Sequence, residues 1–156
     1  ADMAAKVRSW DSSRAIDHAS GYFDRKAGDF HSYHIYFKPF SPKADSEKRV
    51  LALTEFGGYS LPSEGHTVSP VLYGYKMFSD KKTLNENILK LYENDVLGNM
   101  SKGLSAAVYT QVSDVEDEIN GLFTYDRKEI KADASVMKQI ADRLNKAFEE
   151  NSASAD

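Results

Sequence analysis

Cysteine is absent from the 156-residue sequence, which excludes disulfide bonds, thiol nucleophiles and cysteine-based metal sites. No apolar run approaches the roughly 20 residues that a membrane-spanning helix needs. The first residues lack the pattern of a secretory signal, so we expect a cytoplasmic protein with no membrane partner. The four histidines are too scattered for a compact metal motif, and no residue pattern calls for a metal or another cofactor.

Charge and aromatic content say more about the class of ligand. The net charge is −4, with both signs interspersed, whereas a nucleic-acid-binding protein would normally carry a basic face. We therefore expect no nucleic-acid partner. Aromatic residues make up 12% of the chain, and several stand beside polar residues at the ends of expected strands. Flat rings surrounded by hydrogen-bonding groups are typical of sugar sites, although packing in the core is the alternative for each single ring.

The distribution of apolar residues predicts an α/β protein. Helices are expected over 83–92, where Thr83 to Glu86 has a capping-box pattern, and from Val136 to Phe148. Strands separated by helices or long connections pair in parallel. Two folds fit this order, a small doubly wound sheet or part of a (β/α)8 barrel, because a complete barrel needs roughly 250 residues. The sequence predicts strands at 14–20, 31–37, 50–55 and 104–111, the end of a helix at 2–8, and a frayed tail at 151–156.

Glu55 is the candidate functional residue that stands out from the sequence. It ends the apolar run 50–55 and precedes Phe56, Gly57 and Gly58. In a parallel barrel, polar residues at the carboxyl ends of strands line the active site. A carboxylate in this position is costly to bury unless it is hydrogen-bonded or used. On the residues alone, a structural glutamate that caps a loop or pairs with an arginine explains the pattern equally well.

The segment Thr54-Glu-Phe-Gly-Gly58 resembles the nucleophile strand, strand seven, of glycoside hydrolase family 2. Gly103 to Gln111 resembles strand eight of that family, and Asn120 to Lys128 resembles the segment that closes the barrel. Ser13 to Gly21 is similar to strand five, and His34 to Tyr36 to the end of strand six. The resemblance covers residues 3–148. It implies a partial (β/α)8 TIM barrel, strands five to eight with flanking helices, over residues 1–150.

The resemblance also implies roles for single residues. Glu55 would be the nucleophile of a retaining glycosidase, and Tyr36 would donate a hydrogen bond that keeps it ionised. Tyr109 stands where the family usually has a tryptophan and would pack on a sugar ring. His34 and Gln111 would complete the substrate-binding set, with a structural role for His34 as an open alternative.

The expected catalytic apparatus is incomplete. A retaining glycosidase needs a second carboxylate about 5 Å from the nucleophile, which in this family belongs to an Asn-Glu pair ending strand four. The Asn85-Glu86 pair lies in the expected capping box, so we expect the acid/base to be absent and the isolated chain to be inactive.

Several expectations follow for the parent protein and its ligand. Glu118 falls where family members that cleave glucuronides carry an Asn-x-Lys motif, which favours a neutral β-glycoside substrate. The alternative is a non-catalytic carbohydrate-binding or assembly module on a half-barrel scaffold. The bare edges of such a scaffold, 14–20 and 104–111, predict a homodimer or association with the missing half-barrel.

Overall fold

The protein is described by a computed structural model that covers residues 2–153. A three-stranded parallel sheet has the order β1 (Phe30–Ile35), β2 (Val50–Gly57) and β5 (Leu104–Thr110). A short parallel pair joins β3 (Tyr59–Ser60) to β4 (Lys76–Met77), within the long loop, residues 58–80, that follows β2. The predicted α/β class and the parallel pairing of 31–37, 50–55 and 104–111 are therefore confirmed.

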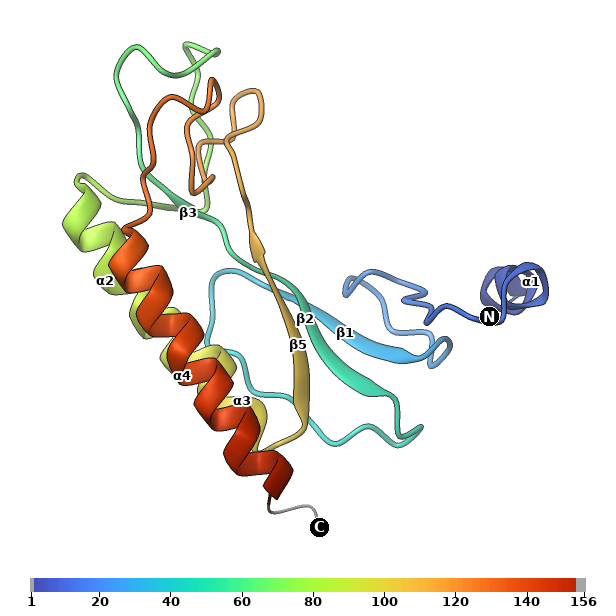
Figure 1. Ribbon diagram of the computed structural model, residues 1–156. Coiled ribbons are helices and arrows are strands. Elements are labelled where there is room, and N and C mark those ends of the chain that lie inside the picture. Colours follow the sequence, from blue (N-terminus) through green and yellow to red (C-terminus); the bar gives the residue numbers. More distant parts are fainter. Residues whose placement is uncertain (1, 154–156) are drawn as a thin grey trace.

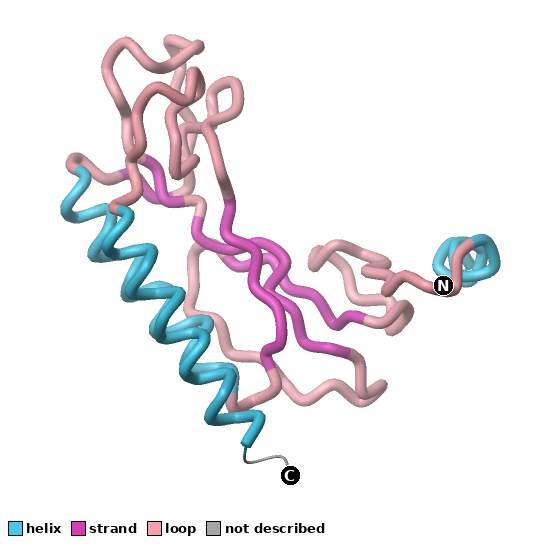
Figure 2. The backbone as a smooth tube through the Cα atoms, in the orientation of Figure 1, coloured by secondary structure: helices cyan, strands magenta, loops and turns pink. Residues whose placement is uncertain are grey.

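The helices cover one face of the three-stranded sheet (Figures 1 and 2). Helix α2 (Lys81–Leu91) continues through a π-helical segment, η1 (Tyr92–Leu97), into the short α3 (Gly98–Met100). Helix α4 (Ala134–Ala153) packs beside α2. In the part of the chain that the structure describes, no helix is long and apolar enough to cross a membrane.

The core lies between the sheet and these helices. Leu53 and Phe56 of β2 are fully buried in one apolar cluster, and Leu84 and Ile88 of α2 are buried in a second. The side chains of Tyr92, Tyr109 and Leu144 pack against both clusters. Tyr92 and Leu144 lie in the segments predicted as helices, 83–92 and 136–148, whereas Tyr109 lies on β5.

The ends of the helices differ from the sequence predictions. Asp80 caps α2, because its carboxylate accepts a hydrogen bond from the backbone N–H of Thr83 at 2.7 Å. The helix therefore begins at Lys81, and Thr83 lies in its first turn. Helix α4 extends to Ala153, so the expected tail is helical over 151–153, and residues 154–156 lie outside the described part.

The prediction of a strand at 14–20 is wrong. Ile16 bonds the residue that precedes β1, through its carbonyl to the backbone N–H of Asp29 at 2.8 Å and its own N–H to the Asp29 carboxylate at 2.6 Å, and Asp17 contacts β1 only through its side chain, which accepts from the Ser32 hydroxyl at 2.7 Å. Ser20 and Gly21 then take positive φ angles of 48° and 79°, which turn the chain away from an extended course. One backbone hydrogen bond does not make a β-ladder, which needs a series of them along both strands.

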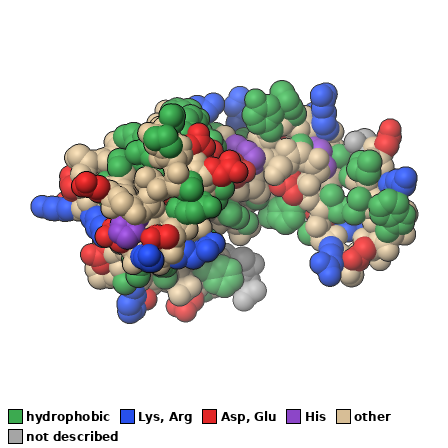
Figure 3. Space-filling view, turned by 90° about the horizontal axis from the view of Figure 1, so that it is seen from above, with side chains coloured by type: hydrophobic (Ala, Val, Ile, Leu, Met, Phe, Trp, Pro, Cys, Tyr) green, Lys and Arg blue, Asp and Glu red, His purple; other side chains and the backbone are tan. Residues whose placement is uncertain are grey.

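The N-terminal segment stands apart from the main body (Figures 1 and 2). Helix α1 (Asp2–Trp10) contains no buried residue. The face of the molecule in Figure 3 carries acidic and basic side chains side by side, and hydrophobic side chains are exposed on the N-terminal segment. The exposed large hydrophobic residues here are Met3, Val7, Trp10, Tyr22 and Phe23.

We expect the chain to associate through the edges of its sheet. Among the described residues, β1 and β5 are the outer strands and neither pairs with a further strand of that sheet. Unpaired strand edges favour addition of another strand, and Val108 of β5 is 56% exposed. Sedimentation at micromolar concentration is expected to give a dimer. A monomer that binds no hydrophobic dye would contradict this, and Val108→Lys is the variant expected to weaken the dimer.

Candidate active site

Glu55 is positioned by an irregularity near the carboxyl end of β2. The pairing register shifts between Tyr33 and His34 on one side and between Leu53 and Phe56 on the other. Leu53 and Phe56 both lie in the same apolar cluster, although strict alternation would place residues three apart on opposite faces. The β-bulge between Leu53 and Phe56 allows both side chains to enter the same cluster, and it leaves the Glu55 side chain 43% exposed.

One oxygen of Glu55 receives the polar contacts of its neighbours. The Tyr36 hydroxyl donates to Oε2 at 2.5 Å, and His34 Nδ1 lies 3.4 Å from the same oxygen. Within the described chain, Oε1 has no such partner. Burial, with the hydrogen bond to Glu55, raises the pKa of the Tyr36 phenol. Tyr36 therefore stays protonated as a donor, and the carboxylate keeps one free oxygen.

The residues next to this pair hold it in place. The Tyr36 hydroxyl also lies 3.3 Å from Thr110 Oγ1 at the end of β5. Gly21 allows close approach to His34, because a Cβ at Gly21 would lie 2.3 Å from the His34 ring. The His34 side chain is 18% exposed, and its Nε2 is buried without a hydrogen-bond partner in the described residues.

Tyr75 adds an aromatic wall that sequence reasoning missed. Its ring stacks on Tyr36 with centroids 4.0 Å apart and an interplanar angle of 4°, and it contacts the rings of Phe37 and Tyr73. Gly58 has φ +62°, and a Cβ there would lie 2.4 Å from the Tyr75 ring. The Tyr73-Gly-Tyr75 pattern inside the long loop is the sequence signal that could have indicated this wall.

The expectation for Tyr109 is corrected. Its ring packs in the core, 5.6 Å from the centroid of Phe56 and 6.2 Å from that of Tyr92. Side chains alternate between the faces of a strand, so Thr110, not Tyr109, reaches the Tyr36 hydroxyl. Tyr109 therefore does not present its ring beside Glu55.

Gln111 belongs to a strap, residues 111–131, that follows β5. Its amide Nε2 donates to Asn120 Oδ1 at 2.6 Å and to Glu118 Oε2 at 3.3 Å. A buried ion pair holds the strap, with Lys131 Nζ 2.6 Å from Asp114 Oδ1. Burial lowers the pKa of Lys131, and the Asp114 carboxylate opposes that change.

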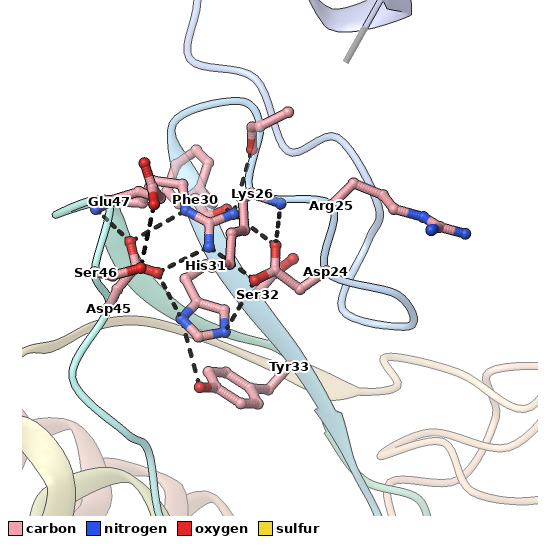
Figure 4. Close-up of polar contacts among 12 residues, drawn as sticks. Asp24, Arg25, Lys26, Phe30, His31, Ser32, Tyr33, Asp45, Ser46 and Glu47 are labelled. Atoms are coloured by element: carbon pink, nitrogen blue, oxygen red, sulfur yellow. Dashed lines mark hydrogen bonds and ion pairs between the residues drawn. The ribbon is translucent and has the colours of Figure 1, made fainter.

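A second polar cluster lies at the opposite end of the sheet, where β1 and β2 begin. The Asp24 and Asp45 carboxylates approach His31 from two sides (Figure 4). These three residues offer a possible ligand set for a metal ion. However, the Arg49 guanidinium bonds both oxygens of both carboxylates, at 2.7–3.1 Å. The positive charge of Arg49 would repel a cation at this position. We therefore interpret Asp24, His31, Asp45 and Arg49 as a structural cluster, called the clip below.

No family model matches the chain, and a search of the curated proteins finds no match. The resemblance to glycoside hydrolase family 2 therefore depends on the sequence segments given above.

Proposed function

We propose that this chain supplies the nucleophile half of a retaining β-glycosidase site, with Glu55 as nucleophile and Tyr36 as the residue that positions it. The observation that carries the proposal is the Tyr36 hydroxyl bonded to Glu55 Oε2 at 2.5 Å, at the carboxyl end of a parallel sheet. In this proposal, the three strands form part of a (β/α)8 barrel, where such strand ends line the active site.

The geometry fits the first step of a retaining reaction. Glu55 Oε1 attacks the anomeric carbon, the glycosidic C–O bond breaks, and the leaving oxygen takes a proton from an acid. Tyr36 keeps its proton and holds Oε2, so the attacking oxygen is fixed in direction. In this proposal, the aromatic wall of Tyr36 and Tyr75 bounds the sugar, and a contact of His34 with a sugar hydroxyl would require its ring to turn, because its Nε2 is buried.

We further propose a neutral β-glycoside as the unit cleaved. Gln111 donates a hydrogen bond to Glu118 within the strap that follows β5. A carboxylate at this position would repel the carboxylate of a uronate. Among the described residues, no second carboxylate contacts Glu55, so the acid must come from elsewhere. The same observation favours the alternative function, a non-catalytic carbohydrate-binding or assembly module.

Covalent labelling tests the nucleophile without needing the acid. A 2,4-dinitrophenyl 2-deoxy-2-fluoro-β-galactoside loses its leaving group unprotonated, and its glycosyl-enzyme is slow to hydrolyse. We expect a single adduct by intact-mass analysis, mapped to Glu55, that forms more slowly in Tyr36→Phe. Ordinary alkyl and aryl β-glycosides are expected to remain intact, because general acid catalysis typically supplies 10²- to 10⁴-fold.

Glu55→Gln is the matched control, since it keeps the shape of the side chain and removes the nucleophile. Labelling of another carboxylate would contradict the assignment of Glu55 as nucleophile. The absence of labelling with both the galactoside reagent and the corresponding 2-deoxy-2-fluoro-β-mannoside would also contradict it. Binding of galactose or mannose without labelling would support the non-catalytic alternative. Turnover of aryl glycosides that Glu55→Gln abolishes would place an acid/base inside this chain.

A further inference from the structure

A cavity of about 660 Å³ lies beside the aromatic wall, between the end of β1 and helix α2. Its lining includes the rings of Tyr36, Tyr59 and Tyr75 and the side chains of Lys38 and Lys90. This volume is within the usual range of small-molecule sites, about 300–1,000 Å³. Because Tyr36 lines the cavity with its ring and bonds Glu55 with its hydroxyl, the cavity adjoins the Glu55 site.

The charge of the cavity is opposite in sign to that of the chain. Lys38, Lys76 and Lys90 contribute three positive charges to its lining, whereas the chain carries a net charge of −4. The carboxyl group in the lining is that of Asp95, which is buried and accepts a hydrogen bond from the Phe40 N–H at 3.2 Å. In the described part, neither Lys38 nor Lys90 has an ion-pair partner.

One of the three lysines is held in place. Lys76 Nζ donates to Asn87 Oδ1 at 3.2 Å and lies 5.1 Å from the ring centres of Tyr59 and Phe78. Asn87 is itself fixed, since its Nδ2 donates to the Thr83 carbonyl at 2.9 Å. The ammonium group therefore keeps a defined position on the wall, with protons left for another acceptor.

We propose that this cavity binds an acidic saccharide unit, one bearing a carboxylate or a sulfate, that is linked to the neutral unit held at Glu55. Rings offer flat faces to a pyranose, and ammonium groups bind the anion. Lys38, Lys76 and Lys90 line the cavity, whereas Glu118 of the strap does not. The inference rests on the proposed function, because Glu55 defines where the neutral unit lies.

Lactitol and lactobionate form a matched pair of probes, since both carry a β-galactosyl group on an open six-carbon chain and only lactobionate carries a carboxylate. We would titrate each into the ¹⁵N-labelled chain at low salt. Lactobionate is expected to bind about five- to tenfold more tightly, from one or two charge-assisted contacts, and to shift the amides near Lys38, Lys76 and Lys90. Salt at about 0.5 M is expected to remove most of that preference.

The double variant Lys38→Gln, Lys90→Gln is expected to lose the preference for lactobionate. Lys138→Gln, Lys146→Gln on α4 makes the same change in charge away from the cavity and is expected to keep it. Equal binding of the two sugars, no binding of either, or a preference that survives the cavity variant would overturn the proposal. Inorganic sulfate that binds as tightly as lactobionate would overturn its saccharide part.

The same titration separates this inference from the proposed function. If covalent labelling fails while the preference remains and disappears in the cavity variant, the nucleophile is wrong and the acidic-sugar cavity stands. If labelling succeeds without any preference, only the cavity assignment falls.

Discussion

Replacing Arg49 by methionine is expected to lower the free energy of unfolding by about 3 kcal/mol at neutral pH. Breaking a buried ion pair by removing one partner costs about 3–5 kcal/mol, and the low end applies because Asp24 is 32% exposed. The Arg49 side chain is 4% exposed and bonds two carboxylates. Without it, Asp24 and Asp45 face one another as uncompensated charges. Urea unfolding followed by far-ultraviolet circular dichroism measures the loss.

The pH dependence identifies the cause of this loss. Hydrogen bonds from Arg49 lower the pKa of Asp24 and lower that of Asp45 to about 2. A carboxyl group whose folded pKa is depressed contributes stability above its unfolded value, near 3.9, and loses it as pH falls through the folded value. The stabilities of the wild-type chain and Arg49→Met are therefore expected to begin converging below about pH 4, with the share of Asp45 lost near pH 2 and that of Asp24 at lower pH.

Lys138→Met is the matched control for this prediction. Lys138 pairs with Asp142 on the exposed face of α4, where the side chains are 74% and 62% exposed. Such a pair contributes about 0.5 kcal/mol or less. An Arg49→Met variant as stable as Lys138→Met at pH 7, or a difference from wild type that persists unchanged at pH 2, would show that the clip does not stabilise the fold.

The parts of the fold that the sequence predicts are those set by local pattern. Val50 to Glu55 is almost wholly apolar, as a parallel strand covered on both faces must be, and it forms β2. The stripe of α2 is equally local, since Leu84 and Ile88 recur at helical spacing and both are buried. The segment 14–20 is more polar, and its expected strand depended on backbone pairing with a neighbour, of which the structure has the bond from the Asp29 N–H to the Ile16 carbonyl.

The parts of the site that escaped prediction depend on long-range contacts or on a break in regular geometry. Tyr36 and Glu55 lie at adjacent strand ends, so parallel pairing alone brings them together. Tyr109 was assigned from the resemblance to glycoside hydrolase family 2, and its ring packs in the core against Phe56 and Tyr92. Tyr75 reaches Tyr36 from the middle of a long loop, which no periodicity describes.

Replacing Lys131 by methionine is expected to give the largest loss of stability, about 3–5 kcal/mol. The side chains of Lys131 and Asp114 are 0% and 3% exposed, so water cannot solvate a carboxylate left alone. Lys131 Nζ also donates to the carbonyls of Ile119 at 2.8 Å and Leu61 at 3.3 Å. Methionine has similar length but no donor, so three buried acceptors lose a bond at once.

The loss should be local as well as global, because Lys131 joins the strap to the long loop. The backbone N–H of Gln111 bonds the Asn120 carbonyl, and we expect its amide to exchange faster with solvent in Lys131→Met than the amides of β2. A double-mutant cycle with Asp114→Asn isolates the charge pair, since the asparagine keeps an acceptor for the Gly121 N–H. A large coupling energy between the two positions is the expected result. Additive losses, or unchanged exchange at Gln111, would mean that Lys131 fills space in the core without holding the strap.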